Sequence, residues 1–286
     1  MREIKKPTTV TEQVDRLIAR GLIIEDREFA ESFFKCVSYY NFSGYLFEFK
    51  NDDDTFNNVK FDDVYNIYLC DKRLKSIILY AIEIVEHNIK TKLAYTIAHR
   101  LGALGYKDAN NFSNPEQHNS MMERLNHNID KNDGLAFVKH HKKHYSDFPI
   151  WVAIELFTLG NVSACYKNIN KSIKKNIASE FSTNFLCLEN WIDCVVYLRN
   201  MSAHYMRLYN LNIPKTPRTD KKHFSKFEPS NKIFDILYVL KLLMPNNNEW
   251  NNYILPTIAS ILEQYSPSID ISKYGFDENW KTLLKI

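Results

Sequence analysis

Residues 62–101, DDVYNIYLCDKRLKSIILYAIEIVEHNIKTKLAYTIAHRL, decide the fold. The stretch holds no Pro and no Gly, and Gly102 follows it as a helix stop. Its apolar residues recur every three or four positions and form one helical stripe: Val64, Ile67, Leu74, Ile78, Ala81, Val85, Ile89, Leu93 and Ile97. A helix of this length spans about 60 Å, which exceeds a typical compact domain. We therefore expect either a bend or a helix that also packs on a partner.

The rest of the chain extends this helical pattern. Thr9 and Glu12 have the spacing of a capping box, and Asp26 is placed to cap a second helix. Further helices are expected over 115–129, 135–145, 150–169, 171–181, from about 186 into 199–204, 230–243 and 247–264, with a Pro-containing basic loop over 210–229. No segment alternates with a period of two, so the predicted fold class is all-α. We divide the chain into a small N-terminal helical part, 1–56, and a main helical domain, 57–286.

Composition excludes several classes of protein. The chain has 286 residues, 45% of them apolar and 25% charged, which is ordinary for a folded protein. Only 7 residues are Gly, which disfavours a Gly-rich phosphate fold and a turn-dense β fold. The five cysteines are odd in number and lack C-x-x-C spacing, which argues against a disulfide framework and a zinc knuckle. The net charge of +3 permits nucleic-acid binding without requiring it.

The sequence also indicates where in the cell the protein is located. The first residues lack the apolar core of a signal peptide, and no apolar run approaches the roughly 20 residues of a membrane helix. We therefore expect a cytoplasmic protein without a membrane partner.

One short segment carries the candidate chemistry. Arg199, Asn200 and His204 lie within six residues at the end of an apolar helix. Histidine exchanges protons near neutral pH, and arginine stabilises the charge of a phosphodiester under attack. Asparagine is suited to orient the histidine or the substrate. The ribose 2′-hydroxyl of RNA supplies its own nucleophile, so this set suits RNA cleavage with no metal and no cofactor.

Helix geometry places a condition on this motif. Five residues along a regular helix rotate by about 140°, so Arg199 and His204 cannot face one point. Asn200 and His204, four residues apart, do share a face. Either the helix is distorted here, or a second copy completes the site. The spacing alone is a weak motif, and the alternative interpretation is a helix end with a surface Arg and a His bonded to a carbonyl group.

Several segments, spread over residues 5–210, resemble the abortive-infection family of bacterial phage-defence proteins, of the AbiD/AbiF type. They are Lys6-Pro7, Thr11-Glu12-Gln13 with Leu17, Gly21-Leu22, Tyr39-Tyr40-Asn41-Phe42-Ser43-Gly44-Tyr45, Ala81-Ile82-Glu83 with Glu86, Pro149-Ile150-Trp151-Val152 with Glu155, and Arg199-Asn200, Ala203-His204, Arg207-Leu208 and Asn210. That family resembles the HEPN superfamily (higher eukaryotes and prokaryotes nucleotide-binding). Its members are helical bundles, and many are metal-independent ribonucleases with an R-x4–6-H motif shared by a dimer.

The resemblance implies a HEPN-like helical bundle in which Arg199, Asn200 and His204 are catalytic. Arg207 and Asn210 also match family positions, and we assign them to RNA binding. The sequence departs from the pattern at Tyr205, where a second His is common, and at Lys90, where an Arg is common. Met206 stands where one toxin subclass has a Tyr that a nucleotidyltransferase modifies, so we do not expect that partner.

Other polar clusters have competing interpretations. Glu86 is a candidate for an accessory role at the motif. Either it and Glu83 lie near the Arg–His motif, or the two are a solvated pair of acids on the helix surface. His140 and His144 have metal-compatible spacing, but their basic neighbours favour a solvated face. The aromatic residues of 39–45 either stack bases or pack in the core. Three basic residues of the 210–229 loop are candidate RNA contacts, as is Lys90: Arg218, Lys221 and Lys222.

The leading hypothesis is a homodimeric, metal-independent endoribonuclease of phage defence, in an abortive-infection or toxin–antitoxin setting. It leaves a 2′,3′-cyclic phosphate and a 5′-hydroxyl. The alternative is an RNA-binding defence protein that holds a structured small non-coding RNA, with cleavage weak or silenced. A third hypothesis is a helical scaffold for another defence protein.

Overall fold

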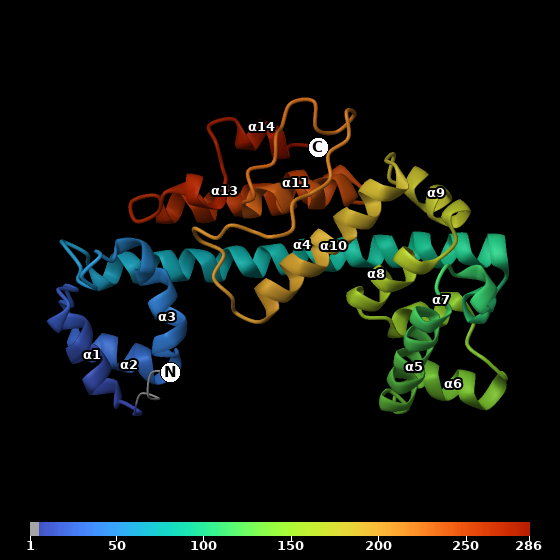
Figure 1. The fold of residues 1–286 in the computed structure, drawn as a ribbon, viewed down its shortest axis with the longest axis horizontal. Helices are drawn as coiled ribbons and strands as arrows, with labels where there is room; N and C mark the ends of the chain where they lie inside the picture. Colours follow the sequence, from blue (N-terminus) through green and yellow to red (C-terminus); the bar gives the residue numbers. More distant parts are fainter. Residues whose placement is uncertain (1–5) are drawn as a thin grey trace.

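The computed structural model describes residues 6–286, and one helix runs through the whole molecule (Figure 1). This helix, α4 (Phe61–Leu101), is unbroken over 41 residues and ends at Gly102, whose φ of +85° is a conformation that glycine adopts readily. The predicted long helix is confirmed, and the bend that was one of the two expectations for it is not seen in Figure 1. The chain's own helices cover α4 along its length, which explains how so long a helix is buried.

The N-terminal arm packs on the first turns of α4. It contains α1 (Val10–Ala19), α2 (Arg27–Cys36), α3 (Tyr39–Leu46) and the short η1 (Phe47–Phe49). The capping box of Thr9 and Glu12 and the cap by Asp26 are confirmed. Phe42 is fully buried, and its ring lies 5.1 Å from that of Phe33 and 5.3 Å from that of Phe61. Core packing is therefore the role of this aromatic residue.

A second arm packs on the other end of α4. It contains η2 (Gly105–Lys107), η3 (Ala109–Asn111), α5 (Pro115–Lys131), α6 (Ala136–His144), α7 (Ile150–Ala153), η4 (Ile154–Leu156), α8 (Leu159–Asn168) and α9 (Lys171–Ser179). The prediction of one helix over 150–169 is wrong. The chain extends at Phe157, and the Thr158 hydroxyl accepts a hydrogen bond from the Asn161 N–H to cap a new helix.

The remaining helices cover the opposite side of α4. They are α11 (Ile233–Leu243), α12 (Asn247–Glu249), the π-helix η5 (Trp250–Ile254), α13 (Leu255–Tyr265), η6 (Ile271–Tyr274) and α14 (Trp280–Leu284). The predicted helix over 247–264 is thus three consecutive pieces. Residues 6–286 contain no strand, so the all-α class is confirmed. None of the helices in this range combines the length and apolar character needed to cross a bilayer.

The position of α10 (Phe185–Ala203) matters most for function. It starts beside α9 and crosses α4 diagonally (Figure 1). Both arms extend from the same side of α4, and the C-terminal end of α10 emerges on that side, between them. The candidate motif stands at this end.

Candidate active site at the end of helix α10

The motif occupies the last turn of α10 and its cap. The helix is regular through Ala203, and His204 closes it with a backbone N–H that donates to the Asn200 carbonyl oxygen at 3.0 Å. Arg199, Asn200 and His204 are exposed, while Leu198 and Met201 bury the other side of the helix. Three polar side chains are thus presented to solvent on a well-anchored support.

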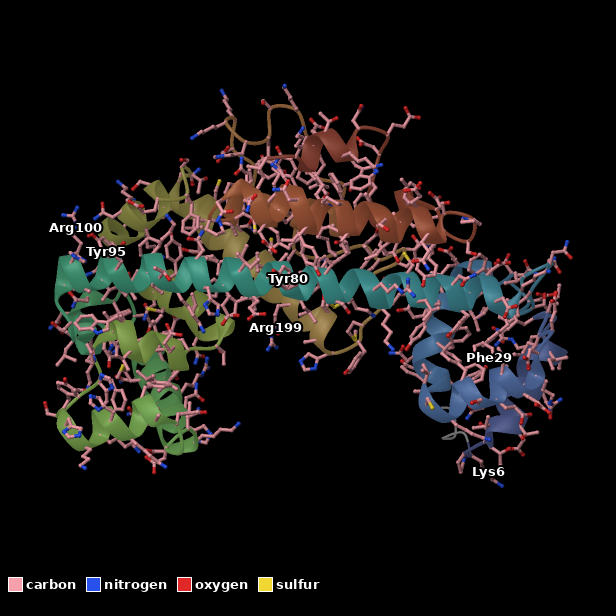
Figure 2. The ribbon with its side chains drawn as sticks, turned by 180° about the vertical axis from the view of Figure 1, so that it is seen from behind. Lys6, Phe29, Tyr80, Tyr95, Arg100 and Arg199 are labelled. Atoms are coloured by element: carbon pink, nitrogen blue, oxygen red, sulfur yellow. The ribbon has the colours of Figure 1, made fainter. Side chains whose placement is uncertain are left out.

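Arg199 and His204 diverge within one chain. Because α10 stays regular, the distortion considered from the sequence does not occur, and the two side chains leave the helix about 140° apart. The Arg199 Nη1 donates to Asn200 Oδ1 at 3.4 Å, and among residues 6–286 the His204 imidazole has no hydrogen-bond partner. Figure 2 shows Arg199 projecting from α10 into the space between the two arms. A single chain therefore presents the two groups without joining them.

The turn after the motif is held by two side chains from other helices. Tyr205 has a φ of +58°, a left-handed conformation that is unfavourable for a bulky residue. The Asn41 amide donates to its carbonyl oxygen at 3.2 Å, and Lys75 Nζ donates to the Met206 carbonyl oxygen at 3.2 Å. These contacts fix the direction in which the chain leaves His204.

A buried carboxylate anchors the same segment from below. Asp71 is fully buried in α4 and accepts hydrogen bonds from the backbone N–H groups of Leu208, at 3.0 Å, and Tyr209, at 3.1 Å. The hydroxyls of Tyr45, at 2.6 Å, and Tyr274, at 3.2 Å, also donate to it. Burial, followed by the charge of Asp71, raises the pKa of the Tyr45 hydroxyl, which keeps it a hydrogen-bond donor. The Lys75 ammonium completes this set at 3.2 Å.

Sequence reasoning missed Asp71, although a signal was available. Asp71 stands four residues after Ile67 and three before Leu74, directly on the apolar stripe of the long helix. An acid on a buried stripe requires partners, because an unpaired buried carboxylate is costly.

Arg207 and Asn210 join the motif segment to the N-terminal arm. Arg207 Nη1 donates to the Gly44 carbonyl oxygen, and the Asn210 amide donates to Glu48 Oε2 at 2.7 Å. Lys232 Nζ donates to Asn210 Oδ1 at 3.4 Å. Both residues are half-buried and make contacts within the chain, and their role in RNA binding stays a prediction.

A cavity of about 410 Å³ adjoins Tyr205, the residue after His204, on the side of the N-terminal arm. Its lining includes Tyr205, Tyr68, Asn41, Lys72 and Lys75. The Tyr205 side chain is 72% exposed, and the Lys72 ammonium has no hydrogen-bond or ion-pair partner within residues 6–286. An exposed ring beside an unpaired cation suits a base stacked next to a phosphate.

Lys90 and Glu86 form an ion pair with each other. Their side chains are 2.8 Å apart on successive turns of α4 and are largely covered. Within the described chain, no hydrogen bond or ion pair joins either of them to Arg199 or His204. Glu83 is exposed to solvent. The accessory role of Glu86 and the RNA contact of Lys90 remain predictions.

The basic loop lies away from the motif. Arg218 accepts a hydrogen bond on its carbonyl oxygen from Trp191 Nε1 at 2.8 Å, and Lys222 Nζ donates to the Ser182 carbonyl oxygen at 3.4 Å. Trp191 stands thirteen residues before His204, so about 20 Å of α10 separates this contact from the motif. Arg218, Lys221 and Lys222 are exposed, but the structure does not bring them to His204.

The histidines of α6 form a surface group of neighbouring, tilted rings. The rings of His140 and His144 lie 4.9 Å apart, next to Tyr145. No group of three or more His, Cys, Asp or Glu side chains within residues 6–286 is arranged to hold a metal ion.

The family model for Abi-like proteins matches residues 32–210, from the second half of α2 to Asn210. The chain belongs to the Abi-like protein family. The match includes all of α4 and α10 and ends six residues after His204, so the motif and its anchoring turn lie inside the family region. Neither a curated protein nor a solved structure matches the chain.

Proposed function

We propose that this Abi-like protein is a metal-independent endoribonuclease that acts in the cytosol during abortive infection by phage. The observation that carries the proposal is the presentation of Arg199, Asn200 and His204, all exposed, on a helix end that is anchored from below by Asp71 and Lys75. The family membership supports a role in defence, and the motif supports RNA as the substrate.

The chemistry follows from these groups. His204 removes the proton from a ribose 2′-hydroxyl, and that oxygen attacks the adjacent phosphorus. Arg199 stabilises the added negative charge, and Asn200 orients the substrate or the imidazole. The bond to the 5′-oxygen breaks, this oxygen takes a proton from water, and the His204 imidazolium returns its proton to the solvent. The products are a 2′,3′-cyclic phosphate and a 5′-hydroxyl.

A homodimer supplies the second set of groups. Since Arg199 and His204 diverge on one helix, the proposal places the α10 ends of two copies against each other, with the arginine of one beside the histidine of the other. A two-fold arrangement of this kind creates two equivalent Arg–His pairs. This organisation is that of a HEPN-type ribonuclease, and within the family it fits the AbiD/AbiF type.

A test compares the wild-type protein with His204→Ala on total RNA in EDTA. We expect cleavage by the wild type and a loss of at least about a hundredfold in the variant, because a general acid–base group is removed. His144→Ala is the matched control, since His144 also ends a helix and is exposed. Equal cleavage by His204→Ala, or cleavage only with added metal, would contradict the proposal.

The second candidate function is RNA binding without cleavage, as in a protein that holds a structured small RNA as antitoxin or guide. Tyr205 and Lys72 favour it, because an exposed ring and an unpaired cation bind RNA without reacting with it. Copurification of one discrete RNA with no cleavage in any condition would support this candidate.

A further inference from the structure

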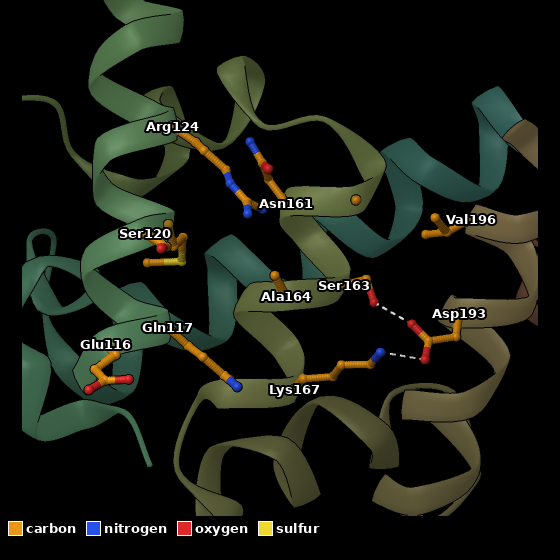
Figure 3. A pocket seen from close by; sticks show the side chains of 12 residues that line it. Glu116, Gln117, Ser120, Arg124, Asn161, Ser163, Ala164, Lys167, Asp193 and Val196 are labelled. Carbon is orange, nitrogen blue, oxygen red and sulfur yellow. Dashed lines mark hydrogen bonds and ion pairs between the residues drawn. The ribbon is translucent and has the colours of Figure 1, made fainter. Parts of the chain in front are cut away.

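A cavity of about 570 Å³ lies between α5, α8 and α10, and its size is typical of small-ligand sites (Figure 3). Helix α5 contributes Arg124, α8 contributes Asn161, and α10 contributes Asp193 and Val196. On the side of Arg124 and Asn161 it adjoins a second hollow of about 380 Å³.

Some polar side chains that line this cavity are paired within the chain, and others are free to meet a ligand. Asp193 accepts a hydrogen bond from the Ser163 hydroxyl at 2.7 Å and forms an ion pair with Lys167. Asn161 is only 7% exposed, yet its side-chain amide has no hydrogen-bond partner in residues 6–286. The Arg124 guanidinium has none either, and Figure 3 shows its side chain and that of Asn161 pointing toward one another. The Asn161 amide faces the open cavity, so its donor and its acceptor are both available to a ligand.

The cavity and the motif share one face of α10. Asn200 and His204 follow Asp193 by seven and eleven residues, which places each within about 20° of Asp193 around a regular helix. Val196, on the rim, precedes Asn200 by one turn, a rise of about 6 Å. An occupant of the cavity therefore lies next to RNA that is bound at the motif.

The charges and shapes of the lining select the ligand. Arg124 and Lys167 are balanced by Glu116 and Asp193, so the cavity does not attract a cluster of phosphates. An asparagine amide pairs with the adjacent donor and acceptor of adenine, and a guanidinium plane stacks on an unpaired base. We propose that this cavity binds one unpaired adenine of the RNA, beside the phosphodiester at the motif. The inference rests on the proposed ribonuclease function for its place in the reaction, but base binding itself is independent of cleavage.

Binding of short oligouridine RNAs with one central A, G, C or U tests the inference, measured on His204→Ala protein to prevent turnover. We expect the adenine-containing RNA to bind best. Asn161→Asp should weaken binding of the adenine-containing RNA roughly tenfold or more and so remove the preference, because the amide NH2 donor becomes a carboxylate acceptor. Arg124→Gln, at an exposed position that tolerates substitution, should weaken it as well. Lys131→Gln removes an equal charge from α5 outside the cavity and is the control.

The outcomes separate this inference from the proposed function. Base-independent binding, or an adenine preference that survives both cavity variants, would overturn the inference even if the wild type cleaves RNA. A preference for adenine that the two variants remove, in a protein that never cleaves, would leave the cavity site standing and refute the ribonuclease.

Discussion

The Asp71 carboxylate, on the third turn of the longest helix, accepts a hydrogen bond from the backbone N–H of Leu208 at 3.0 Å, four residues beyond His204. This contact joins residues that are 137 positions apart in the chain. It fixes the segment that leaves the motif to the helix on which both arms are built. The motif is thus held in place by a hydrogen bond to α4 and does not depend on a free loop.

Asp71→Ala tests this anchoring. Two backbone N–H groups, two tyrosine hydroxyls and the buried Lys75 ammonium lose their acceptor, so we expect the free energy of unfolding to fall by about 3–5 kcal/mol. Urea unfolding measures the change. Asp62→Ala, at an exposed position on the same helix, should cost less than about 1 kcal/mol. Equal stability of the two variants would show that Asp71 does not anchor the segment.

Tyr205→Gly separates backbone strain from RNA contact. Glycine relieves the left-handed backbone at φ +58°, and the exposed ring contributes little packing. We therefore expect the free energy of unfolding to stay level or rise, by up to about 1 kcal/mol. RNA affinity should fall about tenfold through lost stacking. Tyr95→Ala removes an exposed ring at the far end of α4 and should leave RNA affinity unchanged. Unchanged affinity in Tyr205→Gly would exclude a stacking role.

The buried Lys241 ammonium should make the free energy of unfolding depend on pH. Burial lowers the pKa of its ammonium from 10.5 to about 8, although Nζ donates to the Leu283 carbonyl oxygen at 2.7 Å. Between pH 8 and 10.5 the unfolded chain binds more protons than the folded chain, so this group favours folding increasingly as pH rises. Relative to Lys241→Met, the wild type should gain about 1 kcal/mol between pH 7 and pH 10, allowing for partial solvent screening. A difference that is constant over this range would contradict the assignment.

The elements that were predictable are those with local signals. A stretch without Pro or Gly that ends at Gly102 defines α4, and the capping residues Thr9 and Asp26 define the first two helices. The break at Phe157 escaped prediction because the apolar run continues through it. Thr158, the cap of α8, was its one local sign.

The surroundings of the motif depend on contacts that one sequence does not encode locally. Asn41 reaches Tyr205 across 164 positions, and the cavity next to Asn200 is built from three helices. Sequence proximity was also a poor guide to position. The basic loop begins soon after His204, yet Arg218 contacts Trp191 in the first half of α10. The spacing of Arg199 and His204 left two alternatives, a distorted helix or a second copy that completes the site. Because α10 is regular through Ala203, the distorted helix is excluded.

The central claim is that Arg199 of one copy works with His204 of another, and mixing two inactive variants tests it most directly. Arg199→Ala and His204→Ala are purified, unfolded and refolded together, and their cleavage of RNA in EDTA is measured. Half of the dimers are then mixed, and each mixed dimer holds one intact pair, so activity should return to about a quarter of the wild-type value. A mixture that forms dimers and remains as inactive as either variant alone would contradict the account.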